Sequence, residues 1–177
     1  MNKRWVLSVL FAAGMGVTTG YASTPVTVQV YLTVASAQSI GQIAFQDSPY
    51  GLMIKPHLQG LPPGIHGFHV HVNPDCGDHG LKAGGHLDPT DTGKHLGPYD
   101  PNGHLGDLPV LIVDAQGHAD LPLLAPRLKT QQLLGHAIMI HAGGDNYSDT
   151  PSKLGGGGAR LACGVIKLPS IAGEPSA

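Results

Sequence analysis

The sequence predicts an all-β fold in which antiparallel strands form a sandwich or a barrel. Glycine (26 residues) and proline (15 residues) are abundant in the 177-residue chain, which favours short strands and elaborate loops over long helices. Apolar residues recur at every second position in several short runs, the period of a half-buried strand. Helical spacing is nearly absent, and the length suits a single domain.

The first 22 residues have the composition of an export signal. Lys3 and Arg4 precede an apolar run over residues 5–17, and the small residues Gly20 and Ala22 suit cleavage after Ala22. That run is shorter than the roughly 20 residues that span a membrane, so an anchor is the weaker alternative. We therefore expect a cleaved signal peptide over residues 1–22 and an exported mature domain over residues 23–177, without membrane insertion.

Seven runs predict strands. In the first, residues 26–34, valines at positions 26, 28 and 30 alternate with mostly polar neighbours. The other predicted strands cover residues 40–45, 51–58, 65–72, 110–113, 136–141 and 161–168. Residues 114–117 predict a hairpin turn, and residues 127–134 predict one or two helical turns.

Two long stretches depart from the strand pattern. Residues 73–108 combine glycine and proline with histidine and aspartate, the residue types that bind metals. Residues 142–159 contain six glycines, four of them consecutive at positions 155–158. Loops of this length inside a compact domain are usually functional or disordered. The ligand-type residues favour a functional role for the first loop. The second loop, residues 142–159, lies between an apolar predicted strand and a cysteine, so both of its ends are anchored.

Cysteine content and charge narrow the class of protein further. Cys76 and Cys163 are the two cysteines, and in an exported protein an even number favours a disulfide bond over two free buried thiols. A net charge of −2 gives no support to a nucleic-acid-binding protein, which would usually be basic.

The eleven histidines outnumber the ten lysines and arginines, and several have the spacing of metal ligands. His69 and His71 are two positions apart in a predicted strand, so both imidazoles share a face and can converge on one metal. His141 can add a nitrogen to that pair, and all-nitrogen ligation suits copper(II). A more specific set, at spacings of nine, nine and three residues, is His86, His95, His104 and Asp107. Three imidazoles and a carboxylate are a tetrahedral set that zinc accepts.

Five segments together resemble the copper,zinc superoxide dismutases. They are residues 67–71, 85–86, 94–98, 104–108 and 158–166. Residues 141–149 resemble the exported bacterial, periplasmic branch of that family, and the likeness extends from about residue 26 to residue 168. The resemblance implies an immunoglobulin-like, antiparallel Greek-key β-sandwich or flattened barrel with two long functional loops. It also implies a periplasmic superoxide dismutase with one copper and one zinc per subunit.

The resemblance further assigns roles to individual residues. The implied copper ligands are His69, His71, His86 and His141, and the implied zinc ligands are His86, His95, His104 and Asp107. His86 would bridge the two metals and carry a proton in catalysis. Arg160 would stand beside the copper and bind the superoxide anion, and Asp145 would orient one copper histidine and one zinc histidine. Cys76 and Cys163 would form the intrasubunit disulfide.

Two other classes of function compete with this interpretation. A copper or zinc carrier on the same fold would need the ligands but neither Arg160 nor a bridging histidine, and a zinc hydrolase would leave a coordination position open for water. Monomer and homodimer both remain open. The remaining histidines are expected to be surface or structural residues: His57, His66, His79, His118 and His136.

Overall fold

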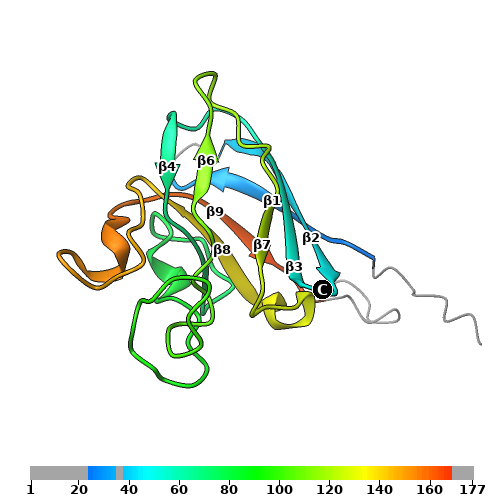
Figure 1. Ribbon diagram of the computed structural model, residues 1–177. Helices are drawn as coiled ribbons and strands as arrows, with labels where there is room; N and C mark the ends of the chain where they lie inside the picture. Colours follow the sequence, from blue (N-terminus) through cyan, green and yellow to red (C-terminus); the bar gives the residue numbers. More distant parts are fainter. Residues whose placement is uncertain (1–23, 35–37, 169–177) are drawn as a thin grey trace, which may run out of the picture.

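The computed structural model describes residues 24–34 and 38–168, and within them it shows a curled antiparallel sheet with a smaller sheet beside it (Figure 1). The strands in this part of the chain are β1 (Val26–Leu32), β2 (Ser39–Ser48), β3 (Gly51–Leu58), β4 (Gly64–His66), β5 (Phe68–His71), β6 (Leu111–Val113), β7 (Leu123–Ala125), β8 (His136–His141) and β9 (Arg160–Ile166). Three short 3-10 helices accompany them: η1 (Leu81–Ala83), η2 (Thr130–Leu133) and η3 (Lys153–Gly156). The predicted all-β class is confirmed. The predicted signal peptide lies outside the described residues.

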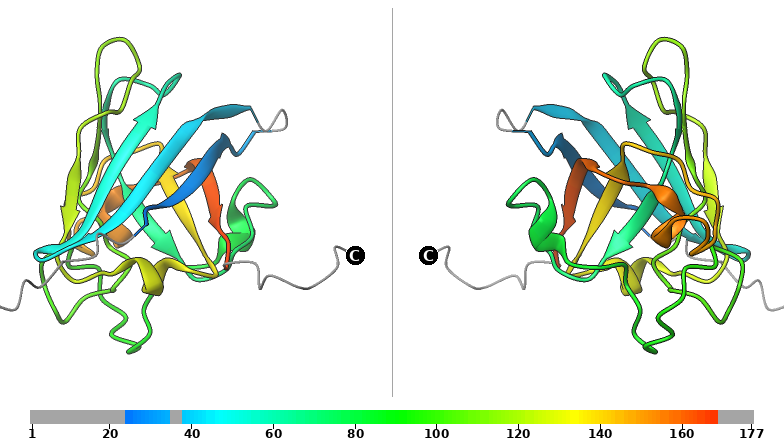
Figure 2. Two further views of the ribbon diagram at one scale, coloured as in Figure 1. Left: turned by 90° about the vertical axis from the view of Figure 1, so that its right-hand side faces the viewer. Right: turned by 90° about the vertical axis from the view of Figure 1, so that its left-hand side faces the viewer.

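Seven strands form the large sheet, in the order β5-β8-β9-β1-β2-β3-β7, and β4 pairs with β6 in the small one. Each of these strand pairs is antiparallel. Strands far apart in the sequence are neighbours, as β1 is to β9, which is the crossed connectivity of a Greek key. Figure 2 shows how the large sheet curls around its inner face. Among the described residues, no helix has the length and apolar character needed to cross a membrane.

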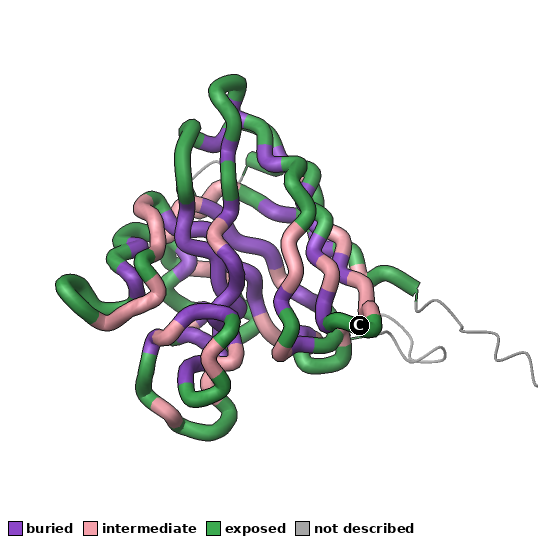
Figure 3. Tube along the Cα trace, in the orientation of Figure 1, coloured by how far each residue is buried: buried purple, intermediate pink, exposed green. Residues whose placement is uncertain are grey.

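The inner face of the curled sheet carries the hydrophobic core. Val28 and Val30 of β1 are buried, whereas the alternate residues Thr27 and Gln29 are exposed, as the alternation predicts. The same core contains Phe45 from β2 and many aliphatic side chains of the other strands. Burial is concentrated along the strands and exposure at the loop tips (Figure 3).

The apolar run predicted as one strand over residues 65–72 forms two strands in different sheets. β4 pairs with β6, and β5 pairs with β8. The change of sheet occurs at Gly67, whose N–H donates to the carbonyl of Gly143. A Cβ on Gly67 would lie 3.2 Å from the carbonyl oxygen of Gly144 and from the ring of His69, so this position favours glycine.

Other predicted bounds shift slightly, and one strand was missed. β1 ends at Leu32, β2 extends beyond residues 40–45 at both ends, and β9 covers Arg160–Ile166. The turn at residues 114–117 is present, and the predicted helical turn is η2. β7 was not predicted because its three residues stand between Pro122 and Pro126 and show no alternation.

Candidate metal centre

The long loop of residues 73–108 completes the free edge of β5 and so delivers its histidine and aspartate side chains to the sheet. Val70 of β5 accepts a backbone hydrogen bond from Leu87 and donates one to Gly106, both at 2.8 Å. Isolated bridges consequently pair His71 with His86 and His69 with Asp107. Residues far apart in the loop thus become direct neighbours of β5.

Strand alternation places three histidines on the outer face of the large sheet. Phe68 and Val70 of β5 point into the core, so His69 and His71 point to the opposite face. His141, at the end of β8, shares that outer face through the same alternation. Although they lie on the outer face, His69 and His71 are at most 1% exposed and His141 is 6% exposed. The two long loops cover them.

The first cluster consists of four imidazoles whose free nitrogens converge. The Nδ1 of His71 lies 2.9 Å from the carbonyl of Gly84, and the Nδ1 of His141 lies 3.2 Å from that of Gly158. Because a carbonyl only accepts, Nδ1 carries the proton in both rings, and both Nε2 atoms are unprotonated acceptors. These two Nε2 atoms face each other at 3.4 Å. Two lone pairs at this distance repel unless a cation lies between them.

Buried nitrogens without a hydrogen-bond partner support the same conclusion. In the first cluster they are His69 Nδ1 and His86 Nε2. Buried polar atoms are nearly always satisfied, so two orphaned imidazole nitrogens beside the facing Nε2 atoms of His71 and His141 indicate ligands. The ligand atoms of His69, His71, His86 and His141 all lie within 4.8 Å of one another. This nitrogen-only set fits copper.

The second cluster surrounds Asp107. Its carboxylate oxygens lie 2.9 Å from His86 Nδ1, 3.0 Å from His95 Nδ1 and 3.4 Å from His104 Nδ1. The set whose ligand atoms all lie within 4.8 Å of one another is His69, His86, His95 and Asp107. His104 is outside that tightest set but contacts the same carboxylate. Three imidazoles around one carboxylate fit zinc. His86 and His69 each occur in both sets of mutually close ligand atoms.

Asp145, from the glycine-rich loop of residues 142–159, joins the two clusters. One of its oxygens lies 2.8 Å from His69 Nε2 and the other 2.7 Å from His95 Nε2. Each ring therefore donates its Nε2 proton to Asp145, which directs Nδ1 of His69 toward the first cluster and Nδ1 of His95 toward Asp107. Gly155, with φ of 70°, lies against this carboxylate, and a Cβ there would overlap Asp145 Oδ1. The glycine run is therefore needed for close packing against the site.

Burial keeps the first cluster neutral. It is the main cause that lowers the pKa of His69 to about 3 and that of His141 to about 4, with repulsion from neighbouring imidazoles adding to it. Neutral imidazoles are the metal-binding form.

The second cluster is held in charged form by its carboxylates. Burial alone would lower the pKa of His95, but its hydrogen bonds to Asp107 and Asp145 outweigh burial and raise that pKa to about 9. Burial would likewise raise the pKa of Asp107, yet the surrounding histidines hold it well below its usual range. Without metal, a proton on His95 therefore balances the carboxylates in place of a cation.

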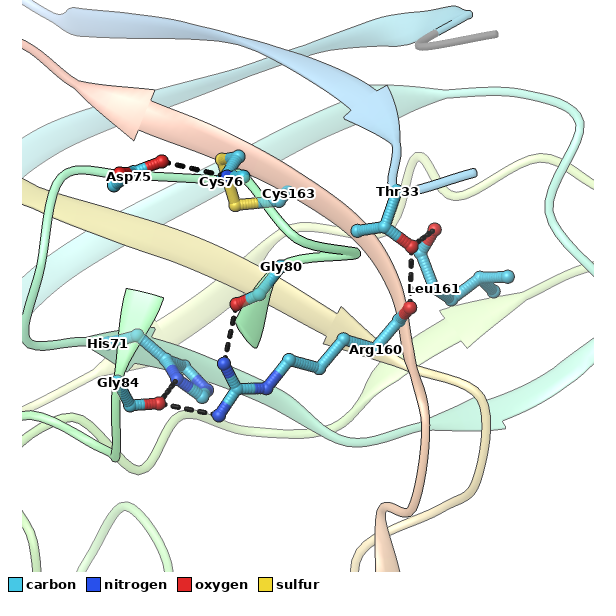
Figure 4. The surroundings of a disulfide bond; sticks show 10 residues. Thr33, His71, Asp75, Cys76, Gly80, Gly84, Arg160, Leu161 and Cys163 are labelled. Atoms are coloured by element: carbon cyan, nitrogen blue, oxygen red, sulfur yellow. Dashed lines mark hydrogen bonds between the residues drawn. A yellow bond between two sulfur atoms is a disulfide. The ribbon is translucent and has the colours of Figure 1, made fainter. Parts of the chain in front are cut away.

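Arg160 stands at the start of β9, directly opposite His141 in the register. Its guanidinium donates to the carbonyls of Gly80 and Gly84 (Figure 4). Its charge is one of the causes that lower the pKa of His71 and His141, which places it beside the first cluster. A guanidinium has five N–H donors, so donors remain for a small anion.

The predicted disulfide between Cys76 and Cys163 is present (Figure 4). It ties the loop of residues 73–108 to β9, with Cα atoms 5.8 Å apart. Gly80 follows Cys76 in the same loop segment and donates its N–H to the carbonyl of Cys76. The disulfide thus fixes a loop whose carbonyls hold Arg160.

Two residues to which the sequence assigned no chemistry, Arg127 and Tyr147, hold the loops in place. Arg127 donates to the carbonyls of Gly103 and His104 at 2.8 and 3.1 Å, which clamps the segment that carries His104. Tyr147 accepts the N–H of Val110 at 3.0 Å, and a Cβ on Gly97 would meet its ring. Neither contact has a sequence signal, because each is made with backbone groups or glycine.

The remaining histidines belong to neither cluster. His66 is buried and hydrogen-bonds through its two nitrogens to the carbonyls of His141 and Pro62, as expected for a structural residue. His79 and His136 each approach a backbone carbonyl, that of Thr33 and that of Val72 respectively. The last two approach surface carboxylates: His57 and His118.

A curled antiparallel β-sheet with two adjacent, buried metal-ligand clusters that have His69 and His86 in common defines a β-barrel metalloprotein with adjacent metal sites. The sequence model of the family described as copper/zinc superoxide dismutase matches residues 39–166. Superoxide dismutase [Cu-Zn] 1 of Salmonella typhimurium is 58% identical over 145 residues, which cover 77% of this chain and 82% of that protein. Superoxide dismutase [Cu-Zn] of Legionella pneumophila is 54% identical over 141 residues, which cover 80% and 86%.

Solved structures agree with the sequence comparison. The copper/zinc superoxide dismutase of Brucella abortus matches with a TM-score of 0.77 and 44% identity over 81% of this chain and all of its own. The solution structure of the monomeric copper, zinc superoxide dismutase of Salmonella enterica matches with a TM-score of 0.71 and 49% identity, at the same coverage of both chains. The chain belongs to the copper/zinc superoxide dismutase family.

Proposed function

We propose that this protein dismutes superoxide in the periplasm, with copper held by His69, His71, His86 and His141, and zinc held by His86, His95, His104 and Asp107. The observation that carries the proposal is the pair of facing, unprotonated Nε2 atoms of His71 and His141, 3.4 Å apart, beside the orphaned nitrogens of His69 and His86. Such a set needs a cation. Family membership supports copper there and zinc around Asp107.

Bound copper supplies a one-electron couple, so that one superoxide is oxidised to dioxygen and a second, with two protons, is reduced to hydrogen peroxide. The Nε2 of His86 is buried and without a hydrogen-bond partner, and an imidazole nitrogen of this kind would serve either as a copper ligand or as a proton carrier. Its Nδ1 lies 2.9 Å from Asp107, on the side of the second cluster. The second cluster therefore fixes the orientation of the ring, and zinc in it has no redox chemistry of its own.

Arg160 is the residue that binds the substrate anion. Burial lowers its pKa, but a guanidinium stays charged at physiological pH. Its two bonds to backbone carbonyls hold the side chain in one position. A fixed cation beside the copper cluster can bind superoxide and attract it to the site.

Two features support the proposed location in the periplasm. The predicted signal peptide over residues 1–22 would carry the mature domain, residues 23–177, out of the cytoplasm. The Cys76–Cys163 bond is of the kind that persists in an oxidising compartment such as the periplasm.

Replacement of Arg160 separates an enzyme from a metal carrier. In the Arg160→Gln variant we expect the dismutation rate to fall by roughly tenfold or more, because one charged hydrogen-bond donor to the substrate is lost. Copper and zinc contents should stay unchanged. Lys55→Gln, which removes a positive charge from an exposed position of β3, is the matched control and should keep full activity. Unchanged activity in Arg160→Gln would contradict the proposed role.

A further inference from the structure

We propose that His57 and His118 form a second, solvent-exposed site for Cu²⁺, separate from the two buried clusters. The sequence offers no link between these two histidines, because 60 residues separate them. The fold brings them to one surface depression, beside two carboxylates. The site is independent of the dismutase reaction.

Backbone pairing places the two side chains on the same face. Leu58 and Ala119 exchange both backbone hydrogen bonds, at 3.2 and 3.0 Å, in an antiparallel bridge. Both residues are at most 2% exposed and belong to the core. Their chain neighbours His57 and His118 therefore point outward. Positions 57 and 118 are diagonal neighbours across this bridge, a separation that long and aromatic side chains span.

Each imidazole has a carboxylate beside its Nδ1. Asp120 Oδ1 lies 2.8 Å from His57 Nδ1, and Asp114 Oδ2 lies 3.8 Å from His118 Nδ1. The hydrogen bond to Asp120 favours the His57 tautomer with the proton on Nδ1, which leaves Nε2 as the acceptor. Metal-binding histidines commonly have this arrangement, in which a carboxylate orients the ring and increases its basicity. At His118 the 3.8 Å separation is longer than a hydrogen bond, and Asp114 contributes negative charge only.

Both histidines line one surface cavity. Its volume is about 170 Å³, and its walls include His57, His118 and Asp120. A water molecule occupies roughly 30 Å³ of liquid volume, so an ion with several bound waters fits. The side chain of His57 is 83% exposed, which leaves the remaining coordination positions to water.

The donor chemistry selects the metal. Imidazole nitrogen suits Cu²⁺, Zn²⁺ and Ni²⁺, and among divalent first-row metals the affinity of such a site is highest for Cu²⁺. Asp114 and Asp120 add negative charge next to the rings, which favours a cation further.

The test uses protein whose two buried sites are already loaded, so that only an additional ion is measured. Titration with Cu²⁺ at pH 7.5, followed by calorimetry and by electron paramagnetic resonance, should show one further ion per chain with nitrogen ligation. His57→Asn and His118→Asn should each weaken this binding at least tenfold, and Asp120→Asn should weaken it by roughly 10- to 100-fold. His136→Asn, which removes a histidine whose Nδ1 bonds to the carbonyl of Val72, is the matched control and should bind as the wild type does.

Two results would overturn the proposal. One is the absence of a further Cu²⁺ with nitrogen ligation in the loaded wild-type protein. The other is unchanged binding in the double variant His57→Asn/His118→Asn. Both residues lie outside the buried clusters, so the dismutation rate of each variant reports directly whether the fold is intact.

Discussion

Loss of the Cys76–Cys163 disulfide should destabilise the metal-free protein by several kcal/mol. The bond joins residues separated by 87 positions, and the entropy of closing a loop of that length in the unfolded chain corresponds to about 4.6 kcal/mol. Domains of this size are stable by roughly 5–15 kcal/mol in total, so the bond supplies a large share. Cys163 packs with Ala83, Ala137 and Met139, and Cys76 packs against the same cluster, so replacement of both cysteines by alanine removes only two sulfur atoms from it.

The assay is urea unfolding of the metal-free Cys76→Ala/Cys163→Ala variant against the metal-free wild type. Metals must be absent, because ligands that bind only the native state would mask the difference. Wild-type protein unfolded in the presence of a thiol reductant is the control, and its curve should approach that of the variant. A decrease of less than about 1 kcal/mol in the free energy of unfolding would refute the loop-entropy reasoning, since the entropy of loop closure predicts a decrease several times larger.

Three further predictions concern the loops and the buried histidines. Asp145→Asn offers one acceptor oxygen where His69 and His95 both donate, so affinity for copper or zinc should fall by roughly 10- to 100-fold in competition with a chelator; unchanged affinity for both metals would contradict the bridging role. In the Arg127→Lys variant the lysine cannot bond to the carbonyls of Gly103 and His104 at once, so zinc should dissociate faster. The control is Lys129→Met, which loses one hydrogen bond to the carbonyl of Ser48 and should release zinc at the wild-type rate. In metal-free protein the free energy of unfolding should be highest near pH 6.5. Below that pH the unfolded chain binds more protons, because the pKa values of His69 and His141 are lowered to about 3 and 4, and stability falls by about 1.4 kcal/mol per pH unit for each histidine. Between pH 6.5 and 9 the folded state binds more protons, because the pKa of His95 is raised to about 9, so stability falls again; a steady rise through this range in urea unfolding would disprove that assignment.

The strands were predictable where one face is buried and the other exposed. Val28 and Val30 show this alternation, and β1 forms around them. The prediction of a single strand over residues 65–72 was wrong because all four residues of β5 are buried, two in the core and two under the loops. The apolar run therefore gives no sign of the change of sheet at Gly67. β7 is too short to show a period.

The metal-ligating residues of the candidate site could be predicted from the sequence, but the residues that hold its loops in place could not. Spacing and resemblance pointed to the histidines and Asp107 because metal ligands must be particular side chains. Arg127 hydrogen-bonds to two backbone carbonyls, and every residue type has a backbone carbonyl, so no sequence motif indicates this contact. The meeting of His57 with His118 depends on the pairing of Leu58 with Ala119, a tertiary contact without a local pattern.

The most direct test of the account is a dismutation assay on the mature protein with copper and zinc quantified in the same sample. We expect fast turnover with one copper in the His69, His71, His86 and His141 cluster and one zinc around Asp107, and loss of turnover when copper is removed. Protein that carries both metals at these positions yet does not dismute superoxide would contradict it.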